Sequence, residues 1–378
     1  MSKKSVPRLI ITGSFLLLLP FVTDSSSATQ DKPVEQVSKN IQVLKGMPES
    51  QLLPVMHLMR TALGVKCEFC HIAENGKYWM DDKPAKQTAR KMIQMTFEIN
   101  KANFNGETVV TCNSCHRGST RPVAIPAFTQ GAFENTTRTE PGEKVPVPEK
   151  LPAVDEILNK YVEAAGGKRA LEGIQTRVKE ASYTRPKLVN PSGKLSALEV
   201  YEKAPNKLLW VTTGPDGTVI SQGYNGKVGW IKTPTEQREM TANEVALFRE
   251  RAELQRELNF KALFSSLRVV NKQKIGERDV YYVSGTNLNG KRERLYFDTT
   301  TGLLVRRVVL SKTILGLDPV QIDYLDYREV NGVKLPFTLE ISYLDSSHYN
   351  TTRKFSQIRN NVPVDDAKFE VPQKSTNK

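Results

Sequence analysis

Histidine and cysteine are both scarce in this chain, with four of each among 378 residues. Long runs of one charge are also missing. Lysine and arginine outnumber aspartate and glutamate, 54 to 41, but they are scattered, and the basic stretches are short pieces such as Lys291-Arg292-Glu293-Arg294. The formal charge of +13 therefore describes a solvated basic surface suited to acidic partners or anionic lipid. The lack of a basic run argues against nucleic acid as a partner.

The chain also lacks an apolar run suited to spanning a membrane. The apolar segment from Leu9 to Val22 is short and is interrupted by Gly13 and Pro20. Basic residues precede it and small residues ending at Ala28 follow it, which predicts a signal peptide over residues 1–28. An uncleaved signal anchor is the alternative. No cysteine lies near the cleavage site, so a lipid-anchored lipoprotein is disfavoured, and we expect the chain in the periplasm or on the outer face of the cytoplasmic membrane.

All four cysteines lie in two copies of one pentapeptide, Cys67-Glu68-Phe69-Cys70-His71 and Cys112-Asn113-Ser114-Cys115-His116. Cys-x-x-Cys-His is the attachment signature of c-type haem. The two thiols form thioethers with the haem, and the following histidine ligates the iron. The sequence therefore predicts two covalently bound c-type haems, held by Cys67, Cys70, Cys112 and Cys115, with His71 and His116 as axial ligands.

The sixth position of each iron needs a further donor, and methionine is a common one. A helix with Pro54 in its first turn and Gly64 at its end is predicted before the first motif, and a second helix over 84–103 before the second motif. The first helix carries Met56, His57 and Met59, and the second carries Met92 and Met95. Each methionine pair lies on one helix face, which suits either core packing or iron ligation. A polar loop over 72–83 and a short strand at 108–110 are expected between these features.

These helices and motifs together resemble the cytochrome c subunit of photosynthetic reaction centres over about residues 40–122. The segments that carry the resemblance are Met56-His57-Leu58-Met59 with the first motif, and Ala89 to Thr96, Ile99-Asn100 and Val110 to Gly118 with the second. The resemblance implies that Met56 and Met92 are the sixth ligands and that Met59 and Met95 pack beside the rings. His57 is the rival to Met56.

The chain departs from the four-haem members of that family in two ways. It has motifs for two haems, and no histidine lies between Met92 and Cys112. A free-standing or respiratory two-haem carrier is therefore as compatible with the sequence as a photosynthetic subunit.

The remainder of the chain predicts a different domain. Six prolines between 121 and 152 predict an extended linker. From 153 to 374 the pattern predicts a helix at 155–165, a long helix at 242–258 and many short strands joined by hairpin turns, hence an α+β domain with a large curved antiparallel sheet. The strands are expected at 176–184, 195–201, 208–212, 228–231, 280–283, 294–297, 303–309, 322–327 and 338–343. This region weakly resembles periplasmic carriers of the lipoprotein-localisation (LolA-like) type, which implies an apolar cavity.

The sequence thus predicts a multi-domain protein with a signal peptide (1–28), a small mainly α dihaem cytochrome c domain (29–120), a linker (121–152) and the sheet domain (153–374). The expected function is electron transfer between redox partner proteins, with a membrane complex among the candidate partners, and not catalysis. Three alternatives stay open. They are a haem enzyme or sensor with an open iron site, a zinc or disulfide protein, and a carrier of lipid or another apolar ligand with accessory haems.

Overall fold

The computed structural model describes residues 31–72, 77–81, 83–122, 150–184, 193–343 and 350–373. The signal peptide expected at 1–28 and most of the expected linker lie outside these residues. Across the described segments, no helix combines the length and the apolar character needed to cross a membrane.

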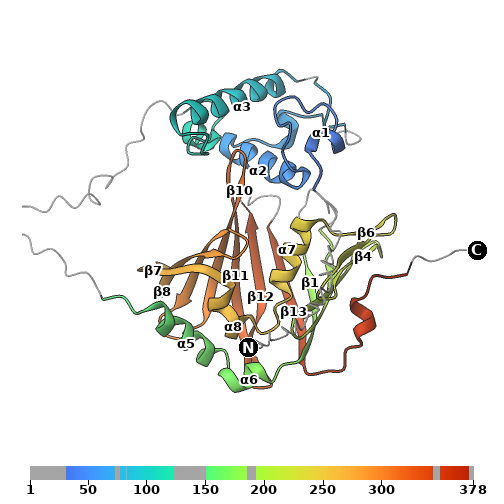
Figure 1. The fold of residues 1–378 in the computed structure, drawn as a ribbon, viewed down its shortest axis with the longest axis vertical. Helices are drawn as coiled ribbons and strands as arrows, with labels where there is room; N and C mark the ends of the chain where they lie inside the picture. The colour runs from blue at the N-terminus through green and yellow to red at the C-terminus, as the bar shows by residue number, and fades with distance from the viewer. Residues whose placement is uncertain are drawn as a thin grey trace, which may run out of the picture.

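The N-terminal part is helical and lies beyond one end of the strands, at the tip of the hairpin of β10 (Leu304–Thr313) and β11 (Gly316–Val330) (Figure 1). The predicted helix over 84–103 is confirmed, and the helix containing Pro54 starts slightly earlier than its proline and ends at Gly64, whose φ is +66°. The strand expected at 108–110 is wrong, because this segment is irregular. The elements are α1 (Val34–Val37), η1 (Glu49–Gln51), α2 (Leu52–Leu63), η2 (Cys67–Phe69), α3 (Pro84–Asn103) and α4 (Cys112–His116).

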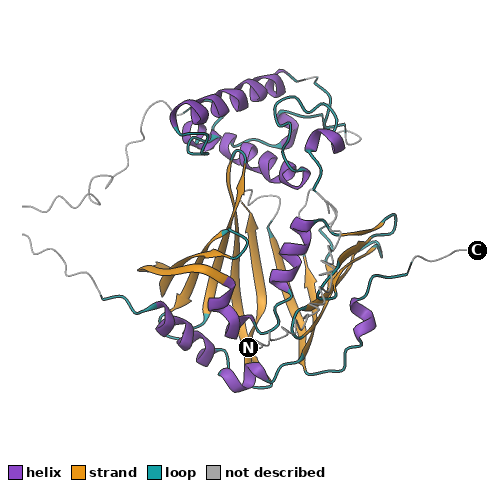
Figure 2. Ribbon diagram, viewed as in Figure 1, coloured by secondary structure: helices purple, strands orange, loops and turns teal. Residues whose placement is uncertain are grey.

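The C-terminal part holds one antiparallel sheet of thirteen strands, with helices against it (Figure 2). The helices are α5 (Val154–Ala164), α6 (Lys168–Glu172), α7 (Ala242–Arg251), α8 (Arg256–Asn259), η4 (Phe260–Leu263) and η5 (Asp366–Phe369). The strands are β1 (Thr176–Tyr183), β2 (Ser196–Lys203), β3 (Lys207–Thr213), β4 (Val219–Tyr224), β5 (Gly229–Lys232), β6 (Gln237–Glu239), β7 (Phe264–Ile275), β8 (Arg278–Asn287), β9 (Arg292–Asp298), β10 (Leu304–Thr313), β11 (Gly316–Val330), β12 (Val333–Tyr343) and β13 (Thr351–Asn360).

The order of the strands follows two meanders that meet in the middle of the sheet. The first runs outward from β1 to the edge strand β6. The segment containing α7 and α8 then leads to the opposite edge, and the second meander returns from β7 to β13, which pairs with β1. The predicted large antiparallel sheet is confirmed, and four of its strands (β4, β6, β7 and β13) were missed from sequence.

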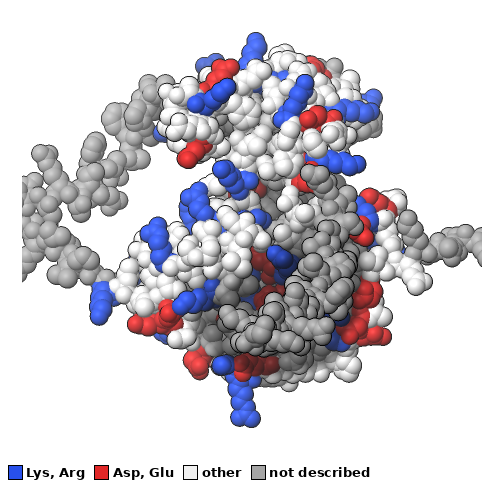
Figure 3. Space-filling model, viewed as in Figure 1, with Lys and Arg blue, Asp and Glu red and all other residues white. Residues whose placement is uncertain are grey.

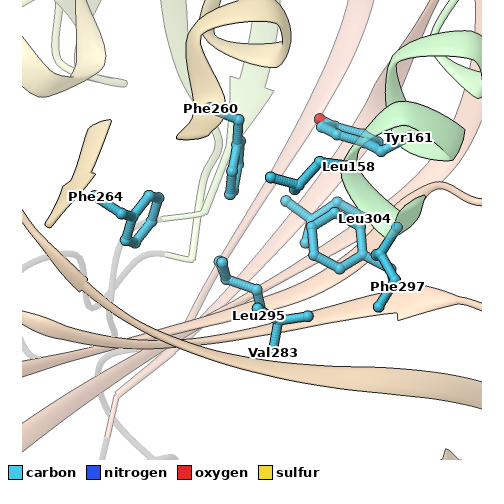
Figure 4. Close-up of a cluster of buried hydrophobic side chains, with 9 residues drawn as sticks. Leu158, Tyr161, Phe260, Phe264, Val283, Leu295, Phe297 and Leu304 are labelled. Carbon is cyan, nitrogen blue, oxygen red and sulfur yellow. The ribbon is translucent and has the colours of Figure 1, made fainter. Parts of the chain in front are cut away.

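Helices and the C-terminal segment cover parts of both faces of the sheet. On one side, α5 and Phe260 pack on β7 to β10, with Tyr161, Phe260 and Phe297 in edge-to-face contacts (Figure 4). The α7 helix packs on β1 to β4 through Phe248. On the other side, the segment ending in η5 covers Trp230, whose indole N–H donates to the Phe369 carbonyl at 2.8 Å.

The single helix expected over 242–258 is wrong, because the chain turns after Arg251. Thr241 caps the start of α7 by a capping box with Glu244. The turn lets Ala252 complete the cluster under α7 while Leu254 joins a different cluster with α6 and β12.

The tip of the β10–β11 hairpin reaches into the N-terminal helices (Figure 1). Leu315 at this tip is 1% exposed and packs with Val34, Val55 and Ile93. The Ile314 N–H donates to Gln51 Oε1 at 3.3 Å. The two parts of the chain, which the sequence predicts as separate domains, therefore share one apolar core.

Candidate haem-binding region

A cavity of about 800 Å³ opens between α2, the first Cys-x-x-Cys-His motif and the start of α3. Its walls include Met56, Cys67, Cys70 and His71, four of the residues that the sequence assigns to the first haem. Met59 and His57 also line it. The volume is within the range of cofactor sites, and the cavity contains thiols, an imidazole and thioethers, which are the donors that a c-type haem needs.

The imidazole of each motif histidine is oriented by a backbone carbonyl. His71 Nδ1 lies 2.8 Å from the Tyr78 carbonyl oxygen, and His116 Nδ1 lies 2.9 Å from that of Ser119. A carbonyl can only accept, so Nδ1 carries the proton in both rings and Nε2 keeps its lone pair. This second hydrogen bond is the usual support of a metal-ligating histidine. Both histidines therefore fit an axial role.

The loop 77–81 forms a wall of the cavity and is fixed by basic side chains of α3. Lys86 Nζ donates to the carbonyls of Tyr78 and Met80, each at 2.8 Å. Arg90 donates to Asp81 Oδ2 at 2.9 Å, and this hydrogen bond holds the pKa of the Asp81 carboxyl far below its usual range. The same loop supplies the carbonyl that orients His71, so α3 positions the first motif indirectly.

Burial sets the protonation of several groups here. Desolvation, and then the nearby charge of Arg60, lower the pKa of His57, and desolvation is also the main cause that lowers the pKa of His71. Both rings are therefore neutral near pH 7. Burial raises the pKa of the Cys70 and Cys112 thiols, which keeps them protonated when unmodified.

The second motif forms α4 and is anchored to α3 by Asn100. The Asn100 amide donates to the Val110 carbonyl at 2.7 Å and accepts the N–H groups of Val109 and Val110 at 3.2 and 2.9 Å. At the start of α4, the Thr111 N–H donates to Ser114 Oγ at 3.0 Å. These hydrogen bonds hold the segment before Cys112 in an irregular conformation instead of the expected strand.

The two motifs are brought together by a close backbone contact. The Gly118 N–H donates to the Ala62 carbonyl at 2.8 Å, and a Cβ on Gly64 would lie 2.2 Å from the Gly118 carbonyl oxygen. Glycine is therefore required at Gly64, both for this approach and for its positive φ. The contact places the loop after His116 against the end of α2.

The methionines proposed for the second haem lie on α3 outside the first cavity. Met92 is half-buried and Met95 is exposed. Met92 is held one turn before the buried Thr96, whose hydroxyl donates to the Met92 carbonyl at 2.8 Å. The structure thus groups Met56 with the first motif in one cavity, and Met92 is not among the residues that line this cavity.

The four cysteines do not form one metal site. They are free thiols in two separate motifs, and nowhere in the described segments do three or more histidine, cysteine or acidic side chains converge as metal ligands. This arrangement does not favour the alternative of a single four-cysteine zinc site or of a disulfide framework.

Sequence reasoning missed much of the cavity wall. Tyr78 and Trp79 lie in the segment that was taken as a polar loop, and Arg60, Lys86 and Arg90 were not considered. The aromatic pair in an otherwise polar loop is the signal that could have identified this wall.

Solved structures with low sequence identity to this chain share part of its fold. A DUF1329 family protein from Desulfovibrio piger covers 57% of this chain and 97% of its own, with 17% identity and a TM-score of 0.42. A LolA superfamily protein from Nitrosomonas europaea covers 58% of this chain and 98% of its own, with 14% identity and a TM-score of 0.42. The second is of the type that the sequence resemblance named.

The N-terminal part was compared with protein families and curated proteins. The photosynthetic reaction center cytochrome c subunit of Roseobacter denitrificans is 33% identical over 99 residues, which cover 24% of this chain and 27% of that protein. The same subunit of Thermochromatium tepidum is 33% identical over 116 residues, which cover 29% and 25%. The chain thus spans about a quarter of the length of these relatives. Residues 15–149 match the family model described as photosynthetic reaction centre cytochrome C subunit, so the N-terminal third of this chain is related to that family of haem electron-transfer proteins.

Proposed function

We propose that this chain is an exported c-type cytochrome with two covalently bound haems that transfers electrons between redox partner proteins. The observation that carries the proposal is the cavity that brings Met56 together with Cys67, Cys70 and His71. The family match of residues 15–149 supports the same chemistry. Each bound haem would supply a one-electron iron couple.

The first haem would be held by Cys67 and Cys70, with His71 and Met56 as the axial ligands. The Tyr78 carbonyl keeps the proton of His71 on Nδ1, so Nε2 is available to the iron. The cavity also contains the basic side chains of Arg60, Lys86 and Arg90. Positive charge in this wall suits the haem carboxylates.

The second haem would be held by Cys112 and Cys115, with His116 and Met92 as the axial ligands. The support for His116 is its hydrogen bond to Ser119, and the support for Met92 is the resemblance of α3 to the family helix. The signal peptide, the periplasmic location, the domain limits and a membrane complex as partner belong to the same proposal.

The number of haems is tested first. We expect two haems per chain after expression in a host that matures c-type cytochromes, measured as the alkaline pyridine haemochrome relative to protein. Replacing Cys67 and Cys70 with alanine should leave one haem, because each motif attaches its own. A chain without covalently retained haem would refute the proposal.

Met56 is tested by its spectrum. The Met56→Ala variant should lose the part of the sulfur-to-iron absorption at the red end of the oxidised spectrum that the first haem contributes, and its reduced form should bind carbon monoxide at one iron. Met59→Ala is the matched control on the same helix face and should keep the full band.

His57 is the specific rival, because it lines the same cavity. If the band is unchanged in Met56→Ala and His57→Ala alters the spectrum instead, the first iron has two histidine ligands. Rapid carbon monoxide binding to the unmodified protein would instead favour an open iron site, as in a haem enzyme or sensor.

A further inference from the structure

Two arginines lie beside Trp210, on the side of the sheet that α7 covers. Arg251 ends α7 and Arg353 lies on β13, and no carboxylate in the described part of the chain lies within ion-pair distance of either guanidinium. Both guanidiniums contact the ring of Trp210, at 5.1 and 4.9 Å from its centroid. Two positive charges therefore contact the same indole ring.

The neighbouring arginines, in contrast, pair with glutamates. Arg307 donates from Nε to Glu293 Oε2 at 2.6 Å and is also paired with Glu250, and Arg256 is 3.8 Å from Glu250. The acidic groups of this region are thus already occupied by other arginines. Excess positive charge remains at Arg251 and Arg353.

Arg251 and Arg353 lie in a hollow of the sheet domain. The Arg251 side chain is accessible to solvent, yet protein surrounds it closely enough that desolvation lowers its pKa. Desolvation, and then the charge of Arg251, lower the pKa of Arg353 to about 10, so Arg353 remains cationic near pH 7. Figure 3 shows charged side chains inside a depression of the sheet domain. This side of the sheet domain therefore carries charged side chains, whereas the LolA-like resemblance implies an apolar cavity.

We propose that Arg251 and Arg353 form a binding site for an oxyanion, a phosphate or a carboxylate, flanked by Trp210. Two guanidiniums that no described carboxylate pairs with offer the fork-shaped donors that such anions accept bidentately. An anion between them would also remove their mutual repulsion. The aromatic side chains nearby, Trp210 and Phe248, lie 5.8 Å apart and provide an apolar wall, so the anion could be free or the head group of an amphiphile.

The site is tested on the full haem-loaded chain by calorimetric titration with inorganic phosphate, dodecyl phosphate and the neutral dodecyl maltoside. We expect the phosphate group to bind, and Arg353→Gln and Arg251→Gln each to weaken binding at least tenfold. Binding of both phosphate ligands would identify a free oxyanion, and binding of dodecyl phosphate alone would identify a lipid-borne one. Arg359→Gln is the matched control, because Arg359 is exposed on the same strand and pairs with Glu180.

Stability separates binding from a structural role. Without ligand, Arg353→Gln should raise the melting temperature, because it removes one of two like charges. No binding of either phosphate ligand, equal binding by wild type and both variants, or a lower melting temperature with unchanged affinity would each overturn the proposal. Neither arginine is among the proposed haem ligands, so a failure to bind phosphate would leave the proposed electron transfer intact.

Discussion

Replacing Leu315 with alanine should lower the free energy of unfolding of the N-terminal helices by about 2–5 kcal/mol, the usual cost of removing a buried leucine side chain. Leu315 is 1% exposed and fills a space between Val34, Val55 and Ile93. The hairpin backbone would hold the alanine in place, so the neighbours could close the gap only in part. Denaturant titration, followed by haem absorbance for the helices and by circular dichroism for the sheet, measures the loss.

Leu288→Ala is the matched control. Leu288 also lies at the tip of a hairpin, but its side chain is 67% exposed. This control should change the free energy of unfolding by less than about 0.5 kcal/mol, as surface substitutions do. Equal effects of the two substitutions would show that the hairpin tip does not contribute to the core of the helices.

Asp318→Asn should stabilise the protein at pH 7 by up to about 3 kcal/mol. Asp318 is 9% exposed, and burial raises the pKa of its carboxyl from 3.8 to about 6. A folded-state pKa above the unfolded one means that the folded state binds more protons between these values. Stability of the wild type should therefore fall as pH rises from about 4 to 6, by about 1.4 kcal/mol for each unit of pKa shift.

Measurement of the free energy of unfolding from pH 4 to 7 checks this prediction, since the variant should lack that part of the decline. Asp323→Asn provides a control of opposite sign on the same strand. Asp323 accepts two hydrogen bonds from Arg306, at 2.5 and 3.2 Å, so its substitution should destabilise the protein at pH 7. A wild-type profile that does not fall relative to Asp318→Asn would contradict the assigned pKa.

Sequence patterns predicted the helices and turns that are determined by neighbouring residues in the chain. The α3 helix begins with Pro84 and carries one apolar stripe, so its limits could be read from sequence. Turns such as Asn331-Gly332 have the positive φ values that their residues indicate. In contrast, β7 was missed because most of its side chains are at least partly exposed, so no clear alternation marks it.

A sequence motif allows site residues to be predicted, whereas residues that reach the site only through packing could not be predicted. The two pentapeptides predict the haem-attaching thiols and the axial histidines directly from the sequence. The wall formed by Tyr78 and Trp79 depends on Arg90 and Lys86, which lie in a different element. Arg251 and Arg353 are far apart in the sequence, and only the folded chain brings both guanidiniums to Trp210.

The shared core also has a consequence for folding during synthesis. Val34 and Leu315 are 281 positions apart (315 minus 34), so the helices are made long before the hairpin that completes their core. Contacts of such separation form late, because the intervening chain must first be closed into a loop. The N-terminal segment therefore remains incompletely packed until the sheet has formed, and its cysteines stay accessible over the interval in which covalent attachment would take place.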